Sequence, residues 1–323
     1  MKRKNSGFTV VELLTVVVII SILIGLLLPG IGMVRNLAKT TQQKAQFVAL
    51  ELGIEAFKND YGEYPESKGN SSESYMGGQK LAEAMVGRDM LGFHPDTDWG
   101  ENGSDYKDYY RGLVSGFDPE NNNPTGPRNE SDRENYEKRK DPYLELESSN
   151  VFRLQSDSAN RISGLYDSSE NTTGLDDDSL VLCDVFKRNN VTVYLPNNKQ
   201  KMIKAGNPIL YYRANLLSKD SNVLPTENRI HDAEDNWRLI RVVSAVMKEK
   251  HDATDDDRSK SFDNDGGPHR NFYTFVSDPK IAKPDAPPGA FRYWPYNSKT
   301  YILISAGRDG LYGTEDDICN FDK

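Results

Sequence analysis

Acidic side chains and glycines alternate near the C-terminus, where together they could hold a metal ion. The stretch Ser305–Ile318 contains three glycines among four acidic residues and directly follows the apolar run Tyr301–Ser305, which predicts a strand. A hard cation such as Ca²⁺ prefers six to eight oxygen ligands, and tight glycine turns allow backbone carbonyls to join carboxylates around one point. Composition alone leaves two interpretations open: a calcium loop, or an acidic loop that is only solvated.

Glu12 is the second side chain whose chemistry needs an explanation, because it lies inside an apolar run. Between Phe8 and Leu28, 16 of the 21 residues are apolar and Glu12 is the only charge. About 20 apolar residues in a helix span a bilayer, and the basic residues at positions 2–4 predict a cytoplasmic N-terminus. Because a carboxylate in a lipid-facing helix is expensive, a plain membrane anchor would not be expected to carry Glu12.

A cleaved secretory signal explains this run less well. Signal peptides have a shorter apolar core, which is followed by a cleavage site of small residues. The residues Leu28–Ile31 offer no such site. The sequence therefore predicts a transmembrane helix over residues 8–29.

The run GFTVVE, from Gly7 to Glu12, resembles the cleavage and methylation motif of the type IV pilin and type II secretion pseudopilin superfamily. The resemblance implies that residues 1–7 are a leader peptide, that a prepilin peptidase cuts between Gly7 and Phe8, and that Phe8 is then N-methylated. It also implies that Glu12 pairs with the α-amino group of Phe8 on a neighbouring subunit. Such a pair would turn an expensive charge into an interface that forms only on assembly.

The C-terminal stretch resembles the calcium loop of major type II secretion pseudopilins, with the order Ser-x-Gly-x-Asp-Gly…Gly-Thr-x-Asp-Asp-Ile. The transition Asn59–Pro65 is a less specific resemblance to the same proteins. Position by position, the resemblance implies side-chain ligands from Asp309, Asp316 and Asp317, main-chain carbonyls from Ala306 and Leu311, and Thr314 as a weaker candidate. Glu315 falls where the family varies and is left out of this set.

Cys183 and Cys319 are the only cysteines. A disulfide between them is chemically allowed on the far side of a bacterial membrane, where it would tie the calcium loop to the predicted sheet. Nothing in the sequence shows that the two thiols are close, so this pairing is left open.

The sequence predicts a long N-terminal helix that carries Glu12. Beyond Pro29, apolar and small residues recur every three or four positions, which predicts an amphipathic helix over residues 30–61 that Gly62 and Pro65 end. The predicted stripe is Ile31, Val34, Ala38, Thr41, Ala45, Val48 and Leu52. Joined to residues 8–29, this helix forms a stalk about 80 Å long, whose second half packs on a globular head at residues 62–323.

The head is expected to contain a small antiparallel sheet, so that the predicted fold class is α+β. Runs of β-branched and aromatic residues predict its strands at Val151–Leu154, Leu180–Phe186, Val191–Leu195, Ile209–Arg213, Phe272–Val276, Phe291–Trp294 and Tyr301–Ser305. Residues 67–290 form a large loop-rich insert, and residues 299–320 form the last strand and the calcium loop. Trp237–Lys248 predicts a short helix.

The first part of that insert, from Ser67 to Asn150, is polar and predicts loops rather than core. Within it, Leu81–Met90 predicts a helical patch. Asn121–Pro124 and Arg128–Lys140 are expected to be exposed and mobile surface.

Composition narrows the classes of function. The 323-residue chain has a mean hydropathy of −0.69 and a net charge of −9, so we expect no nucleic-acid partner. No nucleotide-binding or hydrolase motif is present, and we predict that the protein is not an enzyme. The four histidines, His94, His231, His251 and His269, are expected to be exposed, as are the acidic stretches at 176–178, 255–257 and 263–266.

Two functions remain. The calcium loop favours a pseudopilin of the major type, which would sit in the bacterial inner membrane with its head in the periplasm. It would assemble with itself and other pseudopilins, through an inner-membrane platform, into a filament for protein export. The large insert favours the alternative, a surface type IV pilin-like adhesin in which the insert is a binding module.

Overall fold

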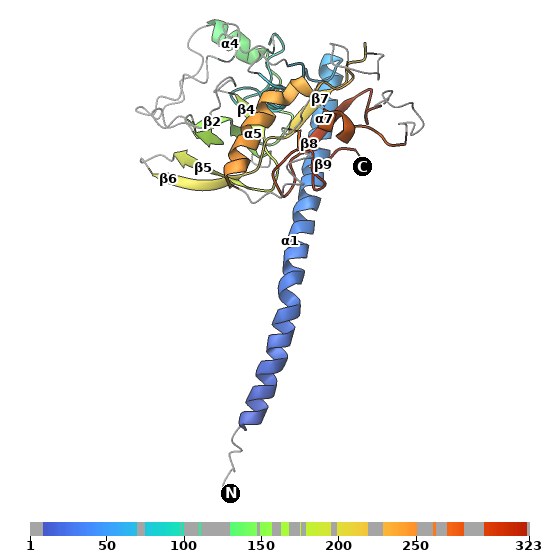
Figure 1. The fold of residues 1–323 in the computed structure, drawn as a ribbon. Helices are drawn as coiled ribbons and strands as arrows, with labels where there is room; N and C mark the ends of the chain where they lie inside the picture. Colours follow the sequence, from blue (N-terminus) through green and yellow to red (C-terminus); the bar gives the residue numbers. More distant parts are fainter. Residues whose placement is uncertain are drawn as a thin grey trace. The chain divides into compact units, whose positions relative to one another are not determined.

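The computed structural model describes residues 9–69, 75–97, 99, 110, 130–146, 149–156, 163–167, 175, 179–194, 199–218, 229–250, 261–262, 270–280 and 294–321. The chain divides into two compact units, residues 1–43 and 44–323. The boundary falls inside α1 (Val10–Tyr61), a helix of 52 residues drawn in blue in Figure 1. The expected N-terminal helix is therefore confirmed.

Gly62 ends α1, as the sequence predicts. Its φ of +84° is left-handed, which glycine adopts without a steric penalty, and its N–H donates to the Lys58 carbonyl at 2.7 Å. Within the described residues, no helix is both long and apolar enough to cross a membrane.

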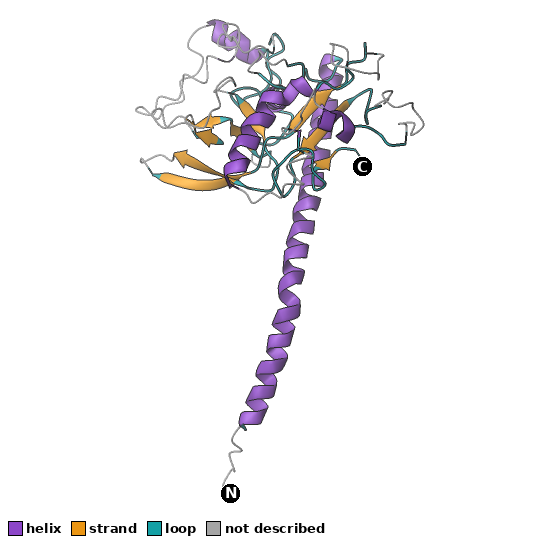
Figure 2. Ribbon diagram, viewed as in Figure 1, coloured by secondary structure: helices purple, strands orange, loops and turns teal. Residues whose placement is uncertain are grey.

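The remaining elements are short helices and strands (Figure 2). The helices are α2 (Gly77–Val86), α4 (Glu130–Glu137), the 3₁₀ helix η2 (Ala233–Asn236), α5 (Trp237–Lys250) and α7 (Arg270–Phe275). The strands are β1 (Val151–Arg153), β2 (Gln155–Ser156), β3 (Tyr166–Asp167), β4 (Leu180–Leu182), β5 (Asn189–Tyr194), β6 (Gln200–Ala205), β7 (Leu210–Arg213), β8 (Tyr301–Ser305) and β9 (Ile318–Cys319). The α+β class is confirmed.

The strands form several small sheets instead of one. The order β7-β8-β9 makes a three-stranded antiparallel sheet in which Leu210 faces Ile304 and Ile304 faces Cys319. β1 pairs with β4 and β5 with β6, both antiparallel, whereas β2 pairs with β3 in parallel. Strand β7 lies within residues 67–290, and β8 lies after them, so the predicted insert contributes directly to the central sheet.

The central sheet is buried on both faces, so all five residues of β8 are buried and the run Tyr301–Ile304 is apolar rather than alternating. Tyr211 and Leu303 pack in one cluster with α2 and with the part of α1 from Phe47 to Phe57. Tyr212 and Ile304 pack in a second cluster with α5 and α7. The second compact unit is thus layered, with helices on each side of the β7-β8 pair.

The apolar stripe predicted on α1 is wrong. All seven of its members are exposed, including Val48 at 54 % and Leu52 at 69 %. The buried face within residues 44–61 is instead made by Phe47, Leu50, Ile54 and Phe57. Both sets recur every three or four residues, so periodicity could not choose between them, and the bulkier aromatic set is the one that the sheet and α2 cover.

This register gives a matched pair of substitutions on α1. We expect Ile54→Ala to reduce the free energy of unfolding by about 2–5 kcal/mol, because it leaves a cavity at a fully buried side chain. Leu52→Ala, two residues away and exposed, should change it by less than about 0.5 kcal/mol. Denaturant unfolding of the full chain in detergent measures both, and equal losses would contradict the buried face described above.

Two further expectations for residues 67–290 are wrong. All ten residues of α2 are buried, although the segment was expected to contain no core. Its polar side chains are satisfied internally: Gln79 Oε1 accepts the Met76 N–H at 2.7 Å, and Glu83 pairs with Arg88 at 3.2 Å. The predicted strand Phe272–Val276 falls on helix α7, because Phe272 packs its ring 4.7 Å from that of Tyr212 and tertiary contact overrides β propensity.

Other predictions for this region have mixed outcomes. The helix expected at Trp237–Lys248 is confirmed as α5, and the helical patch near Leu81 begins earlier, as α2. Part of the expected exposed surface at Arg128–Lys140 is helix α4. Asn121–Pro124 lies outside the described residues, as do the acidic stretches at 176–178, 255–257 and 263–266 and most of the strand expected at 291–294.

Candidate functional site

The C-terminal loop, residues 306–317, joins β8 to β9 and is shaped by three left-handed glycines. Gly307, Gly310 and Gly313 have φ values of +60°, +81° and +98°. At Gly307 an added Cβ would lie 2.4 Å from the Asp316 carbonyl oxygen, so the two ends of the loop approach each other where only glycine fits. The glycine spacing in the sequence therefore has a steric cause.

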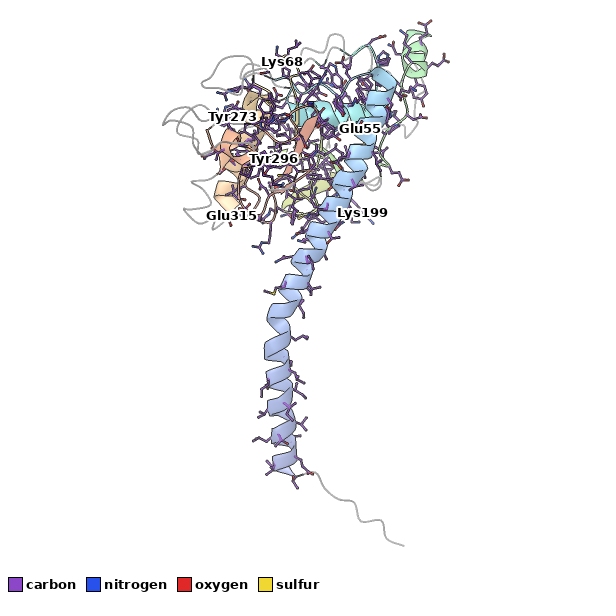
Figure 3. All side chains as sticks on the ribbon, turned by 90° about the vertical axis from the view of Figure 1, so that its right-hand side faces the viewer. Glu55, Lys68, Lys199, Tyr273, Tyr296 and Glu315 are labelled. Atoms are coloured by element: carbon purple, nitrogen blue, oxygen red, sulfur yellow. The ribbon has the colours of Figure 1, made fainter. Side chains whose placement is uncertain are left out.

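The loop brings together the three aspartates expected to supply carboxylate ligands. One carboxylate oxygen each from Asp309, Asp316 and Asp317 lies within 4.8 Å of the others. Asp317 is buried, while Asp309 and Asp316 are half-buried. Glu315, which was left out of the expected ligand set, is exposed at the loop surface (Figure 3).

Backbone N–H groups of the loop point at these carboxylates. Asp316 Oδ2 accepts from the Arg308 and Asp309 N–H groups at 2.5 and 2.8 Å, and Asp317 Oδ2 accepts from the Gly313 N–H at 2.7 Å. Asp309 Oδ1 in turn accepts the Leu311 N–H at 2.8 Å. These hydrogen bonds hold the acidic side chains inward.

Two of the other expected ligands, Thr314 and Leu311, border the same cluster. The Thr314 hydroxyl lies 2.8 Å from Asp316 Oδ1 and 3.3 Å from the Leu311 carbonyl oxygen. The Ala306 carbonyl accepts the Gly310 N–H at 3.0 Å. The structure thus places the three carboxylates, the Thr314 hydroxyl and the Leu311 carbonyl next to one another, whereas the Ala306 carbonyl is bonded to the Gly310 N–H.

Electrostatics disfavour three neighbouring carboxylates unless a cation joins them. Burial raises the pKa of Asp309 to about 6, and repulsion from the Asp316 carboxylate adds to that rise, while the Leu311 N–H opposes it. A donor set of three carboxylates, a hydroxyl and nearby carbonyls consists only of oxygen, which is the ligand type that Ca²⁺ and Mg²⁺ select. The residues present therefore fit a hard divalent cation.

The close approach of backbone at Gly307 suggests a second matched pair of substitutions. We expect Gly307→Ala to destabilise the fold by clearly more than Gly62→Ala, because both residues have positive φ but only Gly307 has backbone within 4 Å of the new methyl group. The conformational cost alone is about 1–2 kcal/mol, and the overlap with Asp316 adds to it. Thermal unfolding compares the two, and equal effects would mean that the loop relaxes without cost.

At the other end of the chain, Glu12 belongs to a helix cap. The Glu12 carboxylate accepts the Thr9 N–H at 2.8 Å and the Thr9 hydroxyl at 2.7 Å, and the Thr9 hydroxyl oxygen lies 3.3 Å from the Glu12 N–H. This is a capping box, in which a Thr N-cap and a Glu three residues later satisfy each other's N–H groups. Gly7 and Phe8 lie outside the described residues, so their predicted processing stays a prediction.

The two cysteines and the two histidines that the structure describes lie outside these sites. No disulfide links Cys183 to Cys319 in the structure; Cys183 is buried in the core, and Cys319 lies on β9 opposite Ile304. His94 and His231 are buried, so the expectation that they are exposed is wrong. His231 Nε2 lies 3.1 Å from the Tyr296 carbonyl oxygen, and burial lowers its pKa to about 4, which indicates a neutral core residue. His251 and His269 lie outside the described residues.

Comparison with known proteins bears on the N-terminal segment. Residues 2–28 match the family model of the prokaryotic N-terminal methylation motif. This chain has a prepilin-type N-terminus. The match includes Thr9 and Glu12, so the capping box lies within the prepilin-type segment.

Similarity to individual proteins extends somewhat beyond that segment. The chain is 42 % identical over 66 residues to the type II secretion system core protein G of Aeromonas hydrophila, which is 20 % of this chain and 45 % of that protein. It is 34 % identical over 67 residues to the core protein G of Pseudomonas aeruginosa, covering 21 % and 47 %, and 42 % over 65 residues to that of Vibrio cholerae, covering 20 % and 43 %. The match spans less than half the length of these curated relatives. No solved structure matches the chain.

Sequence reasoning missed a group of buried polar residues beneath the C-terminal loop. Asp184 and Asn207 are almost fully buried, and both belong to the hydrogen-bond network that supports the loop. The Asn207-Pro208 dipeptide is a turn signal, but no local pattern indicates what the Asn207 side chain contacts.

Proposed function

We propose that this chain is a pseudopilin-like filament subunit of a type II secretion-like system, with a structural rather than an enzymatic role. A prepilin peptidase would cut between Gly7 and Phe8, and Phe8 would be N-methylated. The subunit would be anchored in the bacterial inner membrane with residues 62–323 in the periplasm. There it would polymerise with itself and with other pseudopilins through an inner-membrane assembly platform.

The observation that carries this proposal is the prepilin-type N-terminus, where the methylation motif and the similarity to core protein G coincide. A second observation supports it. From Val10 to Leu27, the large apolar side chains that the structure describes on α1 are exposed, including Val10 at 80 % and Leu27 at 62 %. Burying such a side chain is favourable by about 1.5–3 kcal/mol, so a bilayer or the helices of neighbouring subunits would cover this surface.

We also propose that the C-terminal loop binds Ca²⁺ through Asp309, Asp316 and Asp317, with carbonyl oxygens of Ala306 and Leu311 and the Thr314 hydroxyl as further ligands. The all-oxygen donor set and the clustered carboxylates support a hard cation. Calcium is favoured over Mg²⁺ because an irregular loop suits a flexible shell of six to eight ligands better than a strict octahedron. When bound, the ion would neutralise the carboxylates and close the loop.

One experiment addresses processing and role together. In a strain expressing the native chain, N-terminal mass spectrometry should find methylated Phe8, and deletion of the gene should remove a set of proteins from the culture medium. An intact Met1, or a start beyond Leu28, would contradict the processing.

A surface pilin-like adhesin is the second candidate. The observation that favours it is that most of the chain, after about residue 67, lies outside the match to core protein G. In that case deletion should remove surface fibres and adhesion while leaving the secreted proteins unchanged.

A further inference from the structure

The C-terminal loop is held by a turn that lies about a hundred residues earlier in the chain. Asn207 Nδ2 donates to the Gly310 carbonyl oxygen at 3.0 Å, and the Tyr312 hydroxyl donates to the Pro208 carbonyl oxygen at 2.5 Å. Asn207 and Pro208 connect β6 to β7. Gly310 follows Asp309 directly and precedes Leu311, so the Asn207 bond fixes the peptide between two of the expected ligands.

The Asn207 side chain is itself held on its other side. Asn189 Nδ2, at the start of β5, donates to Asn207 Oδ1 at 3.0 Å, and the Asn207 N–H donates to Asp184 Oδ1 at 3.3 Å. Asp184 Oδ2 accepts the Ser305 hydroxyl at 3.2 Å, at the point where β8 enters the loop. All four of these side chains are at most 2 % exposed.

The hydrogen-bond network therefore runs from Ser305 through Asp184 and Asn207 to Gly310. It supports the first half of the C-terminal loop. Asn189 Oδ1 accepts no hydrogen bond from the described residues, but the contacts that join Ser305, Asp184, Asn207 and Gly310 are all made, and each of them would leave a desolvated polar group if it were lost. The same Asn207 side chain is joined to the paired ends of β5 and β6, where Asn189 faces Ala205.

We propose that Asn207 is a positioning residue for the metal loop, with Tyr312 as a second tie, and that cation binding at the loop stabilises the β5–β6 ribbon through them. This inference rests on the proposed binding of Ca²⁺ to the loop. Because the Gly310 peptide is held by Asn207 and lies between the expected ligands Asp309 and Leu311, ordering either the network or the metal site lowers the entropic cost of ordering the other.

Calcium affinity tests the positioning role. Using calorimetry on the full chain in detergent, we expect Asn207→Ala to weaken Ca²⁺ binding by about 10–100-fold, the usual effect of removing a residue that orients metal ligands. Asn190→Ala is the matched control, since Asn190 is the neighbouring exposed residue on β5 and should leave the affinity unchanged. Tyr312→Phe removes only a hydroxyl group and should weaken binding in the same direction, which keeps the test valid if Asn207→Ala fails to fold.

Hydrogen exchange tests the coupling. In the wild-type chain, Ca²⁺ should slow amide exchange both in the loop and in β5–β6, whereas in Tyr312→Phe and Asn207→Ala saturating Ca²⁺ should protect the loop alone. A wild-type chain that binds no Ca²⁺ would overturn both the metal proposal and this inference. Wild-type binding with an unchanged affinity in both variants, or with no protection of β5–β6, would overturn this inference alone.

Discussion

Asp317→Asn is expected to remove the stabilisation of this protein by Ca²⁺. The wild-type chain should melt at a higher temperature in Ca²⁺ than in chelator, because the ion binds the folded loop and not the unfolded chain. At a free concentration 100 times the dissociation constant, this linkage is worth about 2.7 kcal/mol. Asparagine keeps the size of Asp317 and can still accept the Gly313 N–H, so the substitution removes mainly the charge.

The same electrostatic argument predicts how Asp317→Asn affects stability when no Ca²⁺ is present. In chelator, Asp317→Asn should be at least as stable as the wild-type chain, since it relieves repulsion between carboxylates that lie a few ångströms apart, worth about 1–4 kcal/mol for effective dielectric constants of 80 to 20. Glu315→Gln is the control, because it makes the same charge change at an exposed position of the loop and should keep the full calcium effect. Melting curves with Ca²⁺, Mg²⁺ and chelator measure all three chains. If chelation leaves the wild-type melting temperature unchanged, the loop is an acidic surface loop.

Glu12→Gln is expected to abolish filament assembly while leaving membrane insertion intact. The proposed pairing of Glu12 with the α-amino group of Phe8 needs a negative charge, which glutamine lacks. Glutamine can still complete the capping box with Thr9, so the helix start is preserved. Removing a charge from the apolar run should if anything favour insertion.

Thr9→Val provides the complementary control. It removes the hydroxyl that caps α1 but leaves the Glu12 charge, and it should therefore assemble. Filaments can be counted by electron microscopy and insertion measured by fractionation of membranes. If Glu12→Gln assembles normally while Thr9→Val does not, Glu12 acts as a helix cap and the intersubunit pairing is wrong.

Local sequence patterns were sufficient to predict a feature when all the residues that form it lie in one short segment of the chain. The N-terminal motif, the helix end at Gly62 and the spacing of acids and glycines at 306–317 each depend on neighbouring residues. The three aspartates were grouped in advance by the resemblance of this loop to the pseudopilin calcium loop, and the structure brings their carboxylates together in a short loop with left-handed glycines.

The sequence by itself determined the long helix, the prepilin-type segment and the acidic, glycine-rich loop at residues 306–317. Only the tertiary structure decided which face of α1 is buried. The face that contains Phe47 and the face that contains Leu52 both follow a helical period, and the central sheet and α2 cover only the face with Phe47. The burial of α2, of His94 and of His231, and the support that Asn207 gives to Gly310, likewise depend on partners distant in the chain. From sequence alone, a polar side chain is expected to lie at the surface. Its burial becomes favourable only when the fold supplies a hydrogen-bonding partner.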